Sequence, residues 1–120
     1  MKGRVDDYGR AIVQILVRHP TSGATAQWTA WIDTGFTGEL VAPLSMIQQL
    51  GLLPESIGRT QLATGIQVPI DLYRCKIDWI GGERDVEIVS SEGHMPLLGV
   101  GLLHKHKLTI NYPARTITLK

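Results

Sequence analysis

The chain has 120 residues, 43% of them hydrophobic and 19% charged, and 12 lysines and arginines against 11 acidic residues give a formal net charge of +1. This composition excludes intrinsic disorder, and the length predicts one domain over residues 1–120 with its own core. The near-neutral charge leaves no basic footprint for nucleic acid or a membrane surface, and no apolar run is long enough to cross a bilayer. A single cysteine and a charged N-terminal segment without a signal-peptide core predict a cytoplasmic protein.

Short apolar blocks bounded by Gly, Pro, Asp or Ser predict many short strands. In chain order we expect strands over 11–17, 24–32, 37–42, 57–63, 66–79, 84–89, 108–112 and 115–119. The Thr64-Gly65 dipeptide between two extended runs predicts a β-hairpin, and Gly81-Gly82 predicts a further turn. Residues 1–9 are expected to form a flexible or dimer-interface arm.

One helix is expected over residues 43–50. Pro43 suits the first helical position, and Leu44, Ile47 and Leu50 recur at helical spacing. Gly51 stands where a glycine closes a helix in the left-handed conformation.

The apolar run 97–103 could open a second short helix through residue 105. Seven to nine strands with one or two short helices predict an all-β chain, built as a small barrel or a sandwich.

The most informative segment joins an apolar strand directly to Asp33, Thr34 and Gly35. A carboxylate is thereby placed at the end of a buried strand, beside a glycine that lets the backbone turn tightly and leaves room for a ligand. The same tripeptide also fits an ordinary turn in which Asp33 accepts hydrogen bonds from its own loop.

Four features in the right order make the chain resemble the retropepsin-like aspartic proteases, especially the small single-domain bacterial ones. They are the Ile32–Gly35 unit, its continuation over 36–43 into a short helix, the hairpin over 61–66 where the family has its flap, and Leu97-Leu98-Gly99 followed by Leu102-Leu103. The closing runs 108–112 and 117–119 also fit the family's final strands, so the resemblance covers roughly residues 11–120.

This resemblance implies a small closed β-barrel of the retropepsin type that assembles as a two-fold homodimer and cleaves peptides or proteins without metal or cofactor. The chain has one Asp-Thr-Gly, and none of its other five Asp residues stands in such a triplet, so a pair of carboxylates requires two chains. The implied site residues are catalytic Asp33, Thr34 and Gly35, substrate-binding Phe36, Thr37, Ala63, Thr64 and Gly65, and structural Leu98 and Gly99.

The chain departs from the viral members of the family directly after the triplet. Phe36 stands in place of a small residue, where its ring either narrows the site or packs inward. Thr37 and Gly38 replace acidic residues that hold the substrate backbone, and Val100 replaces the arginine paired with one of them. The runner-up hypothesis is therefore a retropepsin-like peptide-binding or dimerisation module with weak or no catalysis. The third is a generic small β-barrel with a capped turn at Asp33.

Other reactive residues carry weaker signals. The run His104-Lys105-His106-Lys107 is expected to be a solvated surface segment, because histidines two residues apart do not easily grip one metal ion. Cys75 lies in an alternating strand and is expected to be a small buried hydrophobe and not a nucleophile.

Overall fold

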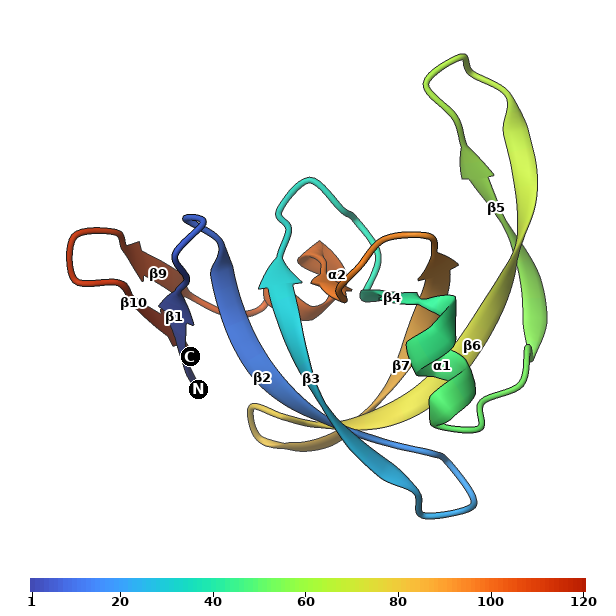
Figure 1. Cartoon of the computed structure of the whole chain (residues 1–120), viewed down its shortest axis with the longest axis horizontal. Coiled ribbons are helices and arrows are strands. Elements are labelled where there is room, and N and C mark those ends of the chain that lie inside the picture. Colours follow the sequence, from blue (N-terminus) through green and yellow to red (C-terminus); the bar gives the residue numbers. More distant parts are fainter.

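The computed structural model describes residues 1–120, apart from the side chain of Thr60. Its strands are β1 (Lys2–Val5), β2 (Ala11–Arg18), β3 (Thr25–Ile32), β4 (Leu40–Pro43), β5 (Ser56–Gln61), β6 (Gln67–Trp79), β7 (Gly82–Ser91), β8 (Leu97–Leu98), β9 (Leu108–Asn111) and β10 (Thr116–Leu119). The two helices are α1 (Leu44–Gln49) and α2 (Val100–Leu103). The all-β class with two short helices is confirmed (Figure 1).

The strands form one sheet in the order β5-β6-β7-β4-β8-β3-β2-β1-β10-β9, and β6 also pairs with β2. That extra pairing, at Val17↔Ile77 and Arg18↔Lys76, links β2, β3, β8, β4, β7 and β6 into a ring of hydrogen-bonded strands. The core is made by buried side chains of these strands together with side chains of β1, β10 and the two helices.

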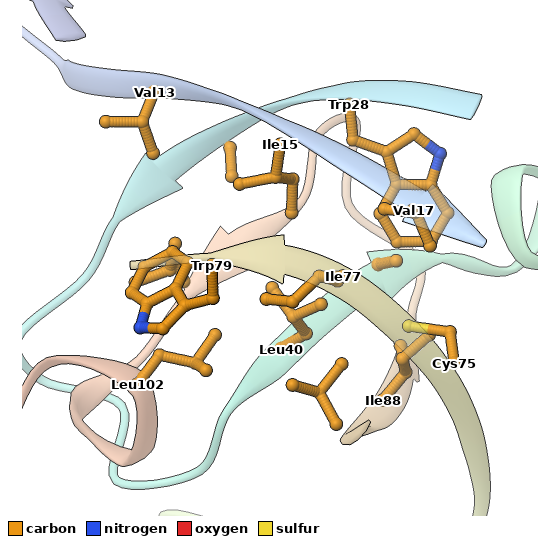
Figure 2. Close-up of a cluster of buried hydrophobic side chains, with 14 of the residues drawn as sticks. Val13, Ile15, Val17, Trp28, Leu40, Cys75, Ile77, Trp79, Ile88 and Leu102 are labelled. Carbon is orange, nitrogen blue, oxygen red and sulfur yellow. The ribbon is translucent and has the colours of Figure 1, made fainter. Parts of the chain in front are cut away.

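The core fills with branched aliphatic side chains and two tryptophans, as Figure 2 shows. Ile15, Val17 and Trp28 come from β2 and β3, and they face Leu40 and Ile77 from β4 and β6. Alternation along β2 and β3 produces this packing, because every second side chain of a strand points to the same side. Strand β3 thus runs along the core and ends at Ile32, on the outer edge of the core.

The expected number of strands was too low, since ten are present. Strand β1 is polar and glycine-containing, so its sequence gave no strand signal, yet it pairs with both β2 and β10. Strand β8 has only two residues and extends where we expected a helix to open. Both gain partners far away in the sequence, β10 for β1 and β3 and β4 for β8.

Two expected boundaries were also displaced. Strand β4 begins at Leu40 and not at residue 37, since 36–39 form a loop. Pro43 ends β4 as the N-cap of α1 in extended conformation, and not as its first helical residue. Gly51 does close the helix with a φ of 81°, as expected.

Both chain ends are paired inside the domain. The Met1 ammonium donates to the Leu119 carbonyl at 2.9 Å, and Leu119 N–H donates back to the Met1 carbonyl at 2.9 Å. Residues 1–9 thus include a strand held between two others. Among the helices described, none is long and apolar enough to span a membrane.

Candidate active site

Asp33 lies at the end of β3, where β3 meets β8. The two strands run parallel with Trp31 opposite Leu97 and Ile32 opposite Leu98, and Asp33 N–H continues the ladder by donating to the Leu98 carbonyl at 2.9 Å. Leu98 itself is fully buried. Leu98 thus contacts the aspartate directly through its backbone carbonyl.

The tripeptide 33–35 forms a tight turn around the Asp33 carboxylate. Gly35 N–H donates to Asp33 Oδ1 at 2.9 Å, and Phe36 N–H donates to the Asp33 carbonyl at 3.2 Å. Asp33 is half-buried, while Thr34 and Gly35 are exposed. This is the Asx-type turn that was also expected if Asp33 had only a structural role.

The next loop, residues 36–39, is held by the start of α2 through three backbone hydrogen bonds. The N–H groups of residues 99, 100 and 101 donate to the carbonyls of residues 39, 36 and 38 at 2.9, 2.8 and 2.9 Å. Gly99 is buried in this contact, and a Cβ there would collide with the Gly38 carbonyl oxygen and the Phe36 ring. A glycine is required at position 99 by close approach and not by its backbone angles, since its φ is −100°.

The Phe36 ring folds back over its own loop. Its atoms lie where a Cβ on Gly38 or Gly99 would stand, so the ring packs between the two glycines. Phe36 is half-buried and also forms part of a groove wall. The bulky residue after the triplet is accommodated because its two neighbours lack side chains.

An ion pair that the sequence did not reveal braces this loop. Glu39 Oε2 accepts from Arg84 Nη2 at 2.9 Å, and Glu39 Oε1 accepts from Glu87 N–H at 2.9 Å. Arg84 Nη2 also donates to the Gly101 carbonyl at 3.1 Å. The guanidinium on β7 thus joins the loop and α2, and both side chains are partly shielded from solvent.

Two hollows lie on either side of the Asp33 turn. The larger, about 620 Å³, is here called the groove; it is lined by loop residues 35–39, by Gly58, Arg59, Gln61, Ile70 and Leu72 of β5 and β6, and by Glu87 and Val89 of β7. The smaller, about 300 Å³, is here called the Trp31 hollow; it is lined by Trp31, Ile32, Asp33, Thr34 and Leu97. Asp33 thus lines the Trp31 hollow, whose walls are mainly apolar, and Gly35 lines the groove, whose walls mix polar and apolar side chains.

The β5–β6 hairpin forms one wall of the groove, but its tip does not. Ala63, Thr64 and Gly65 are exposed at the tip, and the turn is closed by Gly65 N–H donating to the Leu62 carbonyl at 2.9 Å. Gly65 has a φ of 87°, which explains the glycine. Figure 1 shows the hairpin projecting away from the body of the domain. The structure brings Asp33 to Thr37 together with Leu98 and Gly99, but not with 63–65.

Trp31 is 40% exposed beside the aspartate and is held by the loop between β1 and β2. The Arg10 guanidinium lies 5.7 Å from its ring centroid and 5.0 Å from that of Tyr8. Asp6 fixes this arginine, because its Oδ2 accepts from Arg10 Nε at 2.7 Å. The sequence predicted that residue 31 belongs to a strand. Trp31 and Asp33 are two residues apart, so the period-2 alternation of a strand places both on the outward side of β3.

The weaker candidates take no part in this site. Cys75 is buried, and burial, with Glu39 and Asp85 nearby, raises the pKa of its thiol to about 12. It is a packing residue, as expected. Within the described part of the chain, no three His, Cys, Asp or Glu side chains gather to hold a metal ion.

Known structures share this architecture, although the sequence matches no protein-family model and no curated protein. A retropepsin-like aspartic protease from Rickettsia conorii superposes with a TM-score of 0.69 at 16% identity, covering 99% of this chain and 88% of that one. Simian Foamy Virus (mac) protease gives 0.54 at 15% identity over 78% of this chain and 91% of its own. EIAV protease, solved with the inhibitor HBY-793, gives 0.54 at 18% identity over 80% of this chain and 86% of its own.

These neighbours are retropepsin-like aspartic proteases, and the first spans almost the whole chain. The expected resemblance is confirmed at the level of architecture. At these identities the likeness establishes the fold, and the chain has the fold of the retropepsin-like aspartic proteases.

Proposed function

We propose that the chain is an aspartic endopeptidase whose active site forms when two copies bring their Asp33 carboxylates together. The observation that carries this proposal is the position of Asp33 on the retropepsin-like fold, in a backbone-braced turn whose residues line the Trp31 hollow at Asp33 and the groove at Gly35. One chain supplies one carboxylate there, so a two-fold homodimer is part of the proposal.

The chemistry follows from two like charges held a few ångströms apart. Such carboxylates cannot both ionise, so the pair shares one proton and titrates as a unit. The ionised member removes a proton from a water molecule, which attacks the peptide carbonyl carbon. The protonated member donates its proton to the carbonyl oxygen. The other member, now carrying the proton taken from water, then protonates the leaving amine, while the first regains a proton from a hydroxyl of the tetrahedral intermediate. Thr34 of each chain would hydrogen-bond to the other chain across the two-fold axis and hold the two turns together.

An extended peptide is the substrate that these surfaces suit. The groove between loop 35–39 and the hairpin would take one stretch of peptide, and the Trp31 hollow would take an apolar side chain next to the scissile bond. Phe36 and Thr37 would contact the peptide from the loop. The hairpin tip at Ala63, Thr64 and Gly65 would fold over it as a flap.

The test is peptidase activity on a mixed peptide library at mildly acidic pH. We expect cleavage that Asp33→Asn reduces by at least about a thousandfold, because the carboxamide can neither share nor accept the proton. The matched control is Asp85→Asn. It removes an exposed carboxylate of β7, which pairs with Lys76 of β6 at 3.1 Å. Cleavage that survives Asp33→Asn would refute the assignment of the site.

A peptide-binding module without turnover is the second candidate, favoured by one observation. The loop carries no acidic side chain at 37 or 38, and its nearest carboxylate, Glu39, is already engaged by Arg84 and the Glu87 N–H. A hydroxyl-containing mimic of the tetrahedral intermediate separates the two functions. It binds an active dyad much more tightly than the matched peptide does, whereas a binding module holds both equally.

A further inference from the structure

Arg10 lies one strand away from Asp33 on the same face of the sheet. Strands β2 and β3 run side by side (Figure 1) and pair with Ile12 opposite Trp31. Continuing this antiparallel register by two residues places Arg10 level with Asp33. Opposite residues of such a pair point to the same face, and Trp31 is on the outward face, so Arg10 and Asp33 share that face. The sheet thus brings a cation to the edge that carries the proposed catalytic carboxylate.

The Arg10 guanidinium is held in place before any ligand binds. Asp6 Oδ2 accepts from its Nε at 2.7 Å, and Asp6 Oδ1 accepts from the backbone N–H groups of Tyr8 and Arg10, both at 2.9 Å. The guanidinium carbon lies over the Tyr8 and Trp31 rings, 5.0 and 5.7 Å from their centroids. Because one edge and two aromatic faces already restrict this side chain, a ligand that binds it meets little further entropy cost.

The two terminal nitrogens of this guanidinium are free. Within the described part of the chain, the Arg10 side chain makes no hydrogen bond or ion pair other than that of its Nε with Asp6. By contrast, Arg18 and Arg84 use terminal nitrogens on acidic side chains. The Arg10 side chain is 33% exposed, so a ligand can reach its free end. The parallel N–H donors of a fixed guanidinium match the two oxygens of a carboxylate.

Arg10 lines a hollow of about 440 Å³, here called the Arg10 hollow. None of the described residues around this space is acidic, so no fixed negative charge in its wall repels a bound carboxylate. Thr29 Oγ1 accepts from Gln14 Nε2 at 2.7 Å, which leaves the hydroxyl proton of Thr29 available as a donor. Besides Arg10, the lining residues are Gln27 and Thr29 of β3, Met46 of α1, and His94, Met95 and Pro96 ahead of β8.

The Arg10 hollow adjoins the Trp31 hollow. Pro96 lines the first and Leu97 the second, and the Pro96 carbonyl accepts from Trp31 N–H at 2.9 Å. Trp31 lines one hollow and stacks on the arginine of the other. In an extended peptide, side chains two residues apart lie on the same side, about 7 Å from each other. A peptide with one side chain in the Trp31 hollow can therefore direct the side chain two residues away toward Arg10.

We propose that Arg10 binds the carboxylate of an acidic side chain of the substrate, two residues away from the apolar side chain in the Trp31 hollow. The substrate class is then a peptide with an apolar and an acidic residue separated by one position. Arg10 supplies the charge and the N–H donors, and Asp6, Tyr8 and Trp31 hold it in place. The inference rests on the proposed function and adds which peptides the site selects.

Matched peptides test this selection. Each peptide carries one apolar residue and, two positions before or after it, either Glu or Gln, and both peptide ends are blocked so that the side chain is the tested carboxylate. Affinity is measured by fluorescence anisotropy on the Asp33→Asn chain, and kcat/KM is measured on the wild type. In one of the two orders, we expect the Glu peptide to bind about tenfold more tightly than the Gln peptide, with a smaller advantage at high salt.

Arg10→Gln, added to the Asp33→Asn chain, should remove this advantage. The comparison is a ratio of two affinities within one variant, so a lower fraction of folded chain does not alter it. The matched control is Arg18→Gln in the same background. Arg18 also lies on β2, but its terminal nitrogens are engaged by Asp78 and Glu83, so the preference for Glu should remain.

Equal affinities of the Glu and Gln peptides while Arg10 is intact would overturn the inference, and so would an advantage that survives Arg10→Gln or the absence of peptide binding. Cleavage by the wild type that depends on Asp33 would then leave the proposed peptidase standing. An advantage that disappears in Arg10→Gln, without cleavage by the wild type, would support the carboxylate site and overturn the peptidase. The two proposals can thus fail separately.

Discussion

The loop that follows Asp33 and the β5–β6 hairpin both line the groove, and they are held in opposite ways. Backbone hydrogen bonds from β8 and α2 hold the turn and its following loop, and Gly99, Phe36 and the Glu39–Arg84 pair close the space around them. The hairpin is held by pairing between β5 and β6, and the described side chains of residues 56–59 and 61–67 are nearly all exposed. The loop after Asp33 is thus fixed by contacts within the chain, whereas the exposed part of the hairpin covers no other part of its own chain.

This difference teaches how the proposed activity divides between stability and motion. Catalytic groups need to be held in place, and a well-packed turn provides that. A covering segment comes from the weakly held part of a molecule, because it must open and close. Substitutions in the turn should therefore change stability and activity together, and substitutions in the hairpin should change activity alone.

The largest effect is expected from Gly99→Ala. The added methyl collides with the Gly38 carbonyl and the Phe36 ring, so loop and helix must separate. We expect a loss of roughly 2–3 kcal/mol in the free energy of unfolding, measured in urea, together with loss of peptidase activity. Gly93→Ala is the control, because its Cβ would meet only Ser91 Oγ at 3.4 Å. Equal stability of the two variants would contradict the close contact described between Gly99 and the loop 36–39.

Arg84→Gln removes the charge that joins Glu39 to Gly101. The pair is partly shielded, so we expect a loss of roughly 1–2 kcal/mol and a lower kcat, since the loop after Asp33 is loosened. Arg74→Gln should cost less than about 0.5 kcal/mol, because its contacts to Glu55 and Glu87 are longer, at 3.5 and 3.9 Å, and well exposed. Urea unfolding of both variants checks this ranking, and a reversed order would contradict it.

Gly65→Ala tests the role of the hairpin tip separately from that of the Asp33 turn. Alanine in the left-handed region is strained by about 1 kcal/mol, but at an exposed tip this cost falls on local structure. We expect little change in global unfolding and a several-fold drop in kcat/KM. Gly23→Ala imposes the same strain in the turn between β2 and β3, where φ is 78° and no atom lies near. It should leave kcat/KM unchanged, and equal losses in both variants would speak against a flap.

The smallest effect concerns Asp6, which fixes Arg10 over Trp31. Burial of Asp6 raises its pKa, but hydrogen bonds from Arg10 and from Tyr8 N–H outweigh burial and hold the pKa below the usual value. The stabilisation by Asp6 is therefore complete above the unfolded pKa of about 3.9 and is lost as the pH falls through the lower, folded value. Asp6→Asn should destabilise the chain at pH 6 and less so in strong acid. A destabilisation that grows with acidity would contradict this sign.

Local patterns made much of this architecture predictable, and contacts between distant segments account for what was missed. Short apolar blocks bounded by turn residues revealed β2, β3 and β6, and Gly51 and Gly65 marked turns whose backbone angles require glycine. Strand β1 carries no such pattern, because it exists through its pairing with β2 and β10.

The candidate site shows the same division. Asp33 to Gly35 stood out as a carboxylate and a glycine after an apolar strand. The Glu39–Arg84 pair did not, because 45 residues separate the partners and each looks like an ordinary surface charge in sequence. The placement of Trp31 and Leu97 around Asp33 likewise depends on the parallel pairing of β3 with a two-residue strand.

The central claim, that two chains share one active site, is tested most directly by mixing wild-type chains with Asp33→Asn chains. Total concentration is held well above the dimer dissociation constant, subunits are allowed to exchange, and peptidase activity is followed as the wild-type fraction decreases. A shared dyad predicts that activity falls with the square of that fraction, to about one quarter at equal mixing, because only wild-type pairs hold two carboxylates. A linear fall, to about one half at equal mixing, would show that each chain acts alone and would contradict the account.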